Sequence, residues 1–275
     1  MRAVLAFAVL LCGAAAAQEL RIVRPALRQY EDGPVMAASQ TLGPGETVFF
    51  SFQVGGYRRS PEGRVNLHWS VDVLDAEGVK LVESVERDID TDLSAEDKEW
   101  MPIGRHTFMI PPIVPPGPYR LVVKVNDRLA GSEAKEEITL MVRGREVAPS
   151  DTLVARNFRF LHSEDDPVPM REPVYRRGDT IWARFEIAGY KFGERNGIDV
   201  TYGIAVADAE GKVLFEQPEA AAEQKESFYP QKYVPGVVSV TTQKNTNPGE
   251  YFLVLTLRDA VGGQTAEERH GFRLE

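Results

Sequence analysis

Acidic residues between positions 88 and 99 stand in a pattern that could bind a calcium ion. The carboxylates concerned are Asp88, Asp90, Asp92 and Glu99. Calcium-binding loops place oxygen ligands at alternate positions and end on a carboxylate at the twelfth, and Glu99 is the twelfth residue counted from Asp88. The glycine needed at the sixth position is replaced by Leu93, and a run of charges is also typical of a solvated surface. The sequence therefore offers Ca²⁺ in a loop as one hypothesis beside a plain acidic surface, and no other cofactor is expected.

Residues that carry catalysis are not grouped in the sequence. The histidines are His68, His106, His162 and His270, and no two of them stand three or four positions apart as metal ligands often do. No Gly-x-Ser-x-Gly motif marks a nucleophilic serine. Pairs of carboxylates are abundant, but glycoside hydrolysis needs two acids that converge across a cleft, which a linear pattern does not reveal. We therefore expect a protein that is not an enzyme. The alternative is a glycan or peptide hydrolase with its site between two domains.

Two large aromatic residues occupy positions where a partner could bind. Phe49 and Trp182 each stand on the polar side of a segment in which apolar and polar residues alternate. Exposed apolar side chains commonly mark interfaces, so both are predicted partner-binding residues. A loop or the amino-terminal part of each domain folding over them would explain the same pattern. A carbohydrate-binding module is a further alternative, with Trp182 as its leading aromatic.

The strongest pattern in the chain is an internal repeat. The segment 45–57 returns as 178–190, displaced by 178 − 45 = 133 positions, and Pro116-Gly117-Pro118-Tyr119 returns as Pro248-Gly249-Glu250-Tyr251 at 132. A repeat of this length is the size of an ordinary domain. The sequence therefore predicts two equivalent domains from an internal duplication.

Both copies show strand patterns of period two. The predicted strands are 48–54, 65–73 and 116–125 in the first copy and 181–187, 198–206 and 248–257 in the second. Asp-Ala-Glu-Gly turns after 73 and 206 predict hairpins with outgoing strands at 79–85 and 212–216. Ala- and Glu-rich stretches at 94–100 and 218–224 are expected to form a helical turn or two between sheets.

The third pair of strands carries a specific resemblance. Tyr119 precedes Leu121 by two residues after a Pro-Gly corner, and Tyr251 precedes Leu253 in the same way. This resembles the tyrosine corner of immunoglobulin-like and fibronectin-type sandwiches, and Trp69 resembles their buried core aromatic. The resemblance implies an all-β fold of two tandem immunoglobulin-like antiparallel β-sandwiches. It implies no chemistry, because this superfold serves many functions.

The amino terminus predicts export. Residues 1–17 have the charged, apolar and small-residue layout of a signal peptide, with cleavage expected after Ala17. Cys12, the single cysteine, would leave with it. The first sandwich is then expected at 18–145 and the second at 150–275, joined by a short linker. No later segment reaches the roughly 20 apolar residues of a membrane helix.

The net charge of −9 argues against nucleic-acid partners, because those draw on clustered Lys and Arg. The sequence thus predicts a secreted or periplasmic binding, adhesion or scaffold protein whose protein or glycan partner is unknown.

Overall fold

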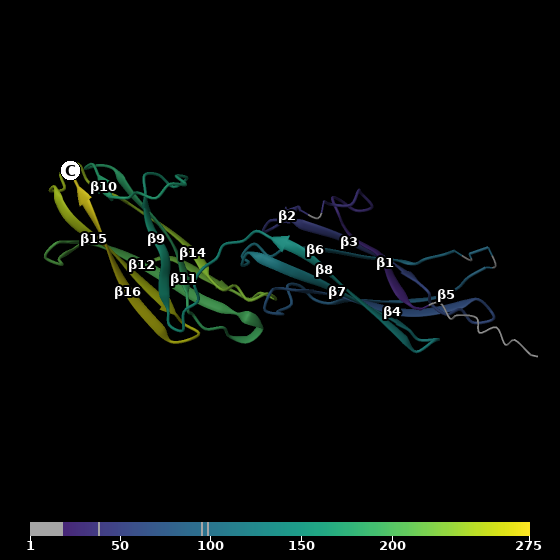
Figure 1. Cartoon of the computed structure of the whole chain (residues 1–275). Helices are drawn as coiled ribbons and strands as arrows, with labels where there is room; N and C mark the ends of the chain where they lie inside the picture. The colour runs from purple at the N-terminus through teal and green to yellow at the C-terminus, as the bar shows by residue number, and fades with distance from the viewer. Residues whose placement is uncertain (1–18, 38, 95, 98) are drawn as a thin grey trace, which may run out of the picture.

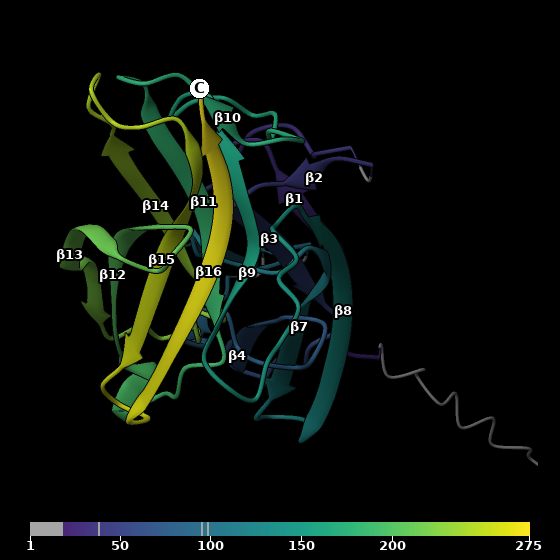
Figure 2. The same cartoon turned by 90° about the vertical axis from the view of Figure 1, so that its left-hand side faces the viewer.

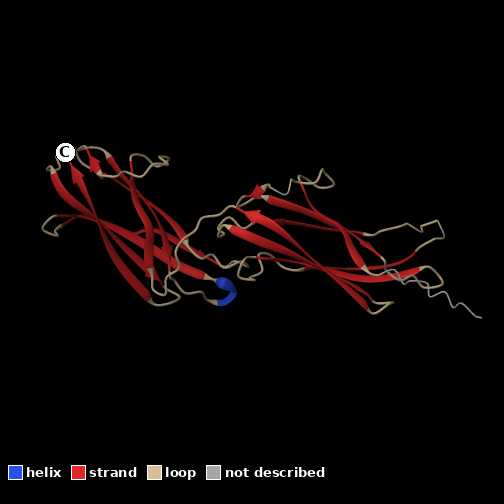
Figure 3. Cartoon of the chain, in the orientation of Figure 1, coloured by secondary structure: helices blue, strands red, loops and turns tan. Residues whose placement is uncertain are grey.

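The computed structural model describes residues 19–37, 39–94, 96, 97 and 99–275. The predicted signal peptide at 1–17 lies outside the described residues. The described part is an all-β chain folded as two sandwiches in a row, and its one helical segment is the short 3₁₀ turn η1 (Glu194–Asn196) near the junction (Figures 1 and 3). None of its helices is long and apolar enough to cross a membrane.

Domain 1 consists of eight strands in two sheets. They are β1 (Arg21–Arg28), β2 (Thr41–Leu42), β3 (Thr47–Gly55), β4 (Arg64–Leu74), β5 (Val85–Asp92), β6 (Ile103–Met109), β7 (Gly117–Asp127) and β8 (Ser132–Val142). One sheet has the order β1-β3-β6 and the other the order β2-β8-β7-β4-β5. All pairs are antiparallel except the short pair between β2 and β8.

Domain 2 repeats this topology strand for strand. Its strands are β9 (Val154–Leu161), β10 (Val174–Tyr175), β11 (Thr180–Ala188), β12 (Ile198–Asp208), β13 (Val213–Lys225), β14 (Val234–Thr241), β15 (Gly249–Asp259) and β16 (Gln264–Leu274). The sheet orders are β14-β11-β9 and β10-β16-β15-β12-β13. Figure 2 looks along the row with domain 2 in front of domain 1. The predicted duplicated sandwich is confirmed.

Each core is built on the same aromatic contact. The Phe52 ring meets Trp69 edge-on at 5.3 Å between ring centroids, and Phe185 meets Tyr202 in the same way at 5.2 Å. Both phenylalanines lie over a glycine of the neighbouring strand, where a Cβ would stand 2.2 Å from the Phe52 ring or 2.3 Å from the Phe185 ring. Since glycine alone leaves room for the ring, the matching pattern reflects equivalent interiors.

The tyrosine corners are present in both domains. The Tyr119 hydroxyl donates to the Pro115 carbonyl oxygen at 2.8 Å, and the Tyr251 hydroxyl donates to that of Asn247 at 2.7 Å. Each bond reaches four residues back and ties the strand to the loop before it. The resemblance drawn from the sequence therefore holds at the level of single hydrogen bonds.

Two local predictions were wrong, and a third was right only as far as turns. Residues 218–224 lie inside the edge strand β13 instead of forming a helical turn, whereas the described residues of 94–100 form turns between the two sheets. In domain 1 the chain after the Asp-Ala-Glu-Gly turn leaves the sheet, and the outgoing strand β5 begins only at Val85. Leu81 instead enters the core, where it is 1% exposed.

Candidate functional site

The predicted calcium ligands lie on a strand, so the loop hypothesis was wrong about their setting. Asp88, Asp90 and Asp92 belong to β5, the edge strand of its sheet, where alternate residues share one exposed face. Glu99 is exposed in the following turn. Within the described residues, no group of three or more acidic, histidine or cysteine side chains could hold a metal ion.

Basic side chains neutralise two of these carboxylates. Asp88 contacts His68 Nδ1 at 2.8 Å and the Arg128 guanidinium at 2.8 Å, and Asp90 contacts Arg64 at 2.7 Å. The hydrogen bond with His68 lowers the pKa of Asp88, and that from Arg64 lowers the pKa of Asp90. Two of the acidic residues of β5 therefore form ion pairs on the protein surface.

Phe49 and Trp182 lie at equivalent outward positions of β3 and β11 and are half-buried. Arg28 and Thr107 flank Phe49 on the neighbouring strands, and Leu161 and Ser239 flank Trp182. In the described part of the chain neither ring stacks on another aromatic ring. Their role in partner binding remains a prediction.

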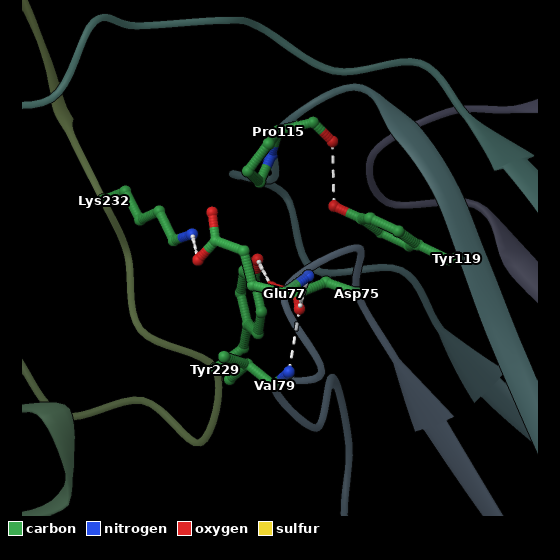
Figure 4. Close-up of polar contacts among 7 residues, drawn as sticks. All are labelled: Asp75, Glu77, Val79, Pro115, Tyr119, Tyr229 and Lys232. Carbon is green, nitrogen blue, oxygen red and sulfur yellow. Dashed lines mark hydrogen bonds and ion pairs between the residues drawn. The ribbon is translucent and has the colours of Figure 1, made fainter.

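The junction between the domains is built around Tyr229. This residue lies in the loop between β13 and β14 of domain 2, yet it is 4% exposed and belongs to the hydrophobic cluster of domain 1. Its hydroxyl donates to Asp75 Oδ2 at 2.9 Å (Figure 4). Burial raises the pKa of Tyr229, and the hydrogen bond to Asp75 raises it further. The tyrosine thus fastens domain 2 into the end of domain 1.

Backbone N–H groups of the following turn orient the Asp75 side chain for this contact. Its Oδ1 accepts the backbone N–H groups of Glu77 at 2.9 Å and Val79 at 2.8 Å, which leaves Oδ2 for the tyrosine. The carboxylate is 2% exposed, so both its oxygens are satisfied away from water. Beside it, Lys232 Nζ contacts Glu77 at 2.7 Å.

A second polar contact joins the linker to domain 2. Arg145 Nε lies 3.0 Å from Glu186 Oε1, and Arg159 lies 3.5 Å from the same oxygen. Glu186 is 1% exposed, because the linker covers this end of β11. The Arg145 backbone N–H also donates to the Val114 carbonyl of domain 1 at 3.2 Å. The linker is therefore attached to both domains.

A cleft of about 590 Å³ opens beside these contacts. Apolar residues dominate its walls, among them Ile113, Pro116, Val147, Tyr190, Phe192 and Tyr233. Glu77, Lys232 and Arg145 are its paired charges, and Glu146 is a further one. The cleft is therefore mostly apolar, with the Lys232–Glu77 ion pair on its wall.

The sequence reasoning did not single out Tyr229, Lys232, Arg145 or Glu186. Three aromatic residues close together in the sequence, Phe228, Tyr229 and Tyr233, were a usable signal. Glu186 alternates with the buried residues of β11, and a period-two pattern does not show that an arginine of the linker contacts the other side of that strand.

Neither a family model nor a curated protein matches the sequence. Among solved structures, the chain is similar to the C-terminal domain of the AgI/II polypeptide BspA of Streptococcus agalactiae, with a TM-score of 0.34 and 11% identity, covering 92% of this chain and 99% of that one. It is similar to the C-terminal domain of the antigen I/II-family protein AspA of Streptococcus pyogenes, with a TM-score of 0.35, 10% identity and coverage of 92% and 99%. A family 123 glycoside hydrolase from Clostridium perfringens matches with a TM-score of 0.30 and 11% identity, covering 45% of this chain and 27% of that one. These likenesses are too distant to transfer an activity or a partner.

Proposed function

We propose that this chain is an exported, non-catalytic binding or scaffold protein that contacts a protein partner at the cleft between its two domains. The observation that carries the proposal is the junction itself, where Tyr229 enters the core of domain 1 and hydrogen-bonds Asp75. Such a contact holds the two walls of the adjoining cleft in one arrangement. A preformed cleft saves the partner the entropy of ordering it.

The lining supports a protein partner more than a glycan. Phe192 is 41% exposed at the cleft, and its ring stands at 75° to that of Tyr190. Flat sugar rings favour parallel aromatic surfaces, whereas apolar side chains fit between rings that meet at an angle. Aromatic residues bordered by charged groups are typical of protein interfaces.

The experiment is capture of envelope proteins with the wild-type protein and with Phe192→Ser as baits. The substitution removes the exposed ring at the mouth of the cleft and leaves the junction contacts of Tyr229 intact. We expect a captured partner to bind Phe192→Ser at least about tenfold more weakly, as for a buried aromatic anchor at an interface. Affinity of the purified partner is then measured by calorimetry.

Val168→Ser is the matched control, because Val168 is also apolar and exposed but does not line the cleft. It should bind as the wild type does. Equal binding by Phe192→Ser and wild type would contradict the cleft as the contact, and turnover of a glycan or peptide by the purified protein would contradict a non-catalytic role.

A further inference from the structure

The outer end of domain 2 corresponds to the end of domain 1 that receives Tyr229. In domain 1 the Ile110 N–H donates to the Glu46 carbonyl at 3.0 Å, and in domain 2 the Thr242 N–H donates to that of Asp179 at the same distance. Both loops then run to the tyrosine corner over the same number of residues. Positions in the two ends can therefore be compared one by one.

In domain 1 this end is filled. Leu81 is 1% exposed, Ile110 is fully buried and Val114 is 1% exposed. Together they close the gap between the two sheets, and Tyr229 covers the outside. The sealed end is the surface on which domain 2 is seated.

In domain 2 the same end is open. Leu214, the counterpart of Leu81, is 49% exposed, because β13 stays in the sheet with an irregularity between Val213 and Phe215. Thr242 and Thr246 stand where domain 1 has Ile110 and Val114, and both are partly exposed. A pocket of about 340 Å³ remains.

The pocket reaches apolar core side chains, and threonine, serine and glutamine side chains line the rest of it. Its walls include Ile181, Val206, Leu214, Phe215, Tyr251 and Phe272. Phe215 is 42% exposed at the rim. Apolar surface in this position favours an occupant with an apolar side chain.

Asp208 is the counterpart of Asp75, and it pairs across the sheet with Tyr251, which lines the pocket. Its Oδ1 accepts the Lys212 N–H at 2.8 Å, which is the counterpart of the Val79 bond to Asp75. No described residue donates a hydrogen bond to Asp208 Oδ2, the counterpart of the atom that accepts from Tyr229. The Asp208 carboxylate therefore shares one of the two backbone hydrogen bonds that orient Asp75, and it lacks the tyrosine.

We propose that the outer end of domain 2 binds a tyrosine-bearing loop of a partner protein. The tyrosine hydroxyl donates to Asp208 Oδ2, and a neighbouring apolar side chain enters the pocket that Leu81 and its neighbours fill in domain 1. Domain 1 indicates what the occupant is. There Asp75, the counterpart of Asp208, accepts a hydrogen bond from Tyr229, which is carried by a loop of the adjoining domain. The site is distinct from the cleft and does not depend on it.

The probe is a peptide with the sequence of residues 227–233, Ser-Phe-Tyr-Pro-Gln-Lys-Tyr, which is the segment that domain 1 already binds. It is titrated into the full chain labelled on Ile, Leu and Val methyl groups. We expect saturable chemical-shift changes at Leu214 and Val206. The peptide carrying Tyr229→Phe should bind roughly tenfold more weakly, because it lacks the hydrogen bond to a carboxylate.

Two protein variants test the two halves of the site. Asp208→Asn keeps an oxygen for the Lys212 N–H but offers an amide to the tyrosine, and it should weaken binding roughly tenfold. Thr242→Ile combined with Thr246→Val fills the pocket as in domain 1 and should weaken binding by a similar factor. Asp199→Asn, at the other end of β12, is the matched control and should leave binding unchanged.

Retained thermal unfolding temperatures show that the variants are folded. Absence of saturable shifts at Leu214 and Val206 would overturn the proposal, as would undiminished binding by Asp208→Asn or by the peptide carrying Tyr229→Phe. Phe192→Ser should bind the peptide as the wild type does, because Phe192 lines the cleft and not this pocket. A failed peptide experiment would therefore contradict this proposal and leave the proposed role of the cleft unaffected.

Discussion

The two domains agree in their interiors and differ at one end. Both place a phenylalanine over a glycine and beside a ring of β4 or β12, and both bury an aspartate at the end of the strand that carries the corner tyrosine. Those aspartates, Asp127 and Asp259, each accept a backbone N–H from the loop between β3 and β4 or between β11 and β12, at 2.6 Å from Arg58 and 2.9 Å from Lys191. At the end that carries the tyrosine corner, domain 1 is closed and covered whereas domain 2 is open.

This difference indicates which part of a duplicated sandwich can acquire a new function. The interior is constrained by close packing, so either copy tolerates little variation there. The end of a sandwich is formed by loops and by the first residues of edge strands, which can change without loss of the core. In this protein the end of domain 1 binds the neighbouring domain, whereas the equivalent end of domain 2 has an accessible pocket.

The largest effect should come from the shared core. Phe52→Ala and Phe185→Ala each remove a ring that is 1% exposed, and we expect each to lower the free energy of unfolding by about 3–5 kcal/mol. Because the two contacts are equivalent, the two losses should be similar. Urea unfolding of the full chain measures them, and hydrogen exchange of β3 and β11 assigns each loss to its domain.

Val168→Ala controls for removal of exposed apolar surface and should change stability by less than about 0.5 kcal/mol. If one phenylalanine could be removed almost without cost while the other could not, the interiors would not be equivalent.

An intermediate effect is expected at the linker, where the copies differ in charge. Glu186 stands where domain 1 has Gln53, and its ion pair with Arg145 has no counterpart there. Arg145→Met leaves a buried carboxylate with only the more distant Arg159 and should cost about 2 kcal/mol, less than for a fully buried pair because Arg145 is half-exposed. Denaturant unfolding measures the cost.

The double variant Arg145→Met with Glu186→Gln restores the residue type of domain 1 and should recover most of that stability. A double variant no more stable than Arg145→Met would show that the linker stabilises the junction by packing and not through this charge pair.

The smallest effect concerns the hydroxyl that distinguishes the covered end. Tyr229→Phe leaves Asp75 Oδ2 without its donor and should lower the free energy of unfolding by about 1.5 kcal/mol at neutral pH. Burial raises the pKa of Tyr229, so its contribution is complete below the ordinary tyrosine pKa of about 10 and is lost as the pH rises towards the folded-state value. Urea unfolding at pH 7 and at pH 11 tests both statements.

The difference in stability between wild type and Tyr229→Phe should therefore shrink at pH 11. A difference that stays constant or grows with pH would mean that the tyrosine is not held in its protonated form by the fold.

The strands and the tyrosine corners were predictable because they depend on short-range patterns. Alternation from 48 to 54 and from 181 to 187 reports which side of a strand is buried, and the Pro-Gly-x-Tyr corner is a local motif. The course of the chain after Gly78 was not predictable, because Leu81 and Leu214 have similar neighbours in sequence and differ in whether the strand stays in the sheet. Docking of Tyr229 was beyond local patterns as well, since it depends on a partner carboxylate in the other half of the chain.

The position of Tyr229 bears on the order in which this chain acquires its structure during synthesis. The hydrophobic cluster of domain 1 includes a side chain encoded in the second half of the chain, so it is complete only after most of domain 2 has left the ribosome. Until then, Asp75 faces water at an uncovered end, and the first sandwich is a less stable version of its final form. Maturation of the amino-terminal half is thereby made conditional on translation of the carboxy-terminal half.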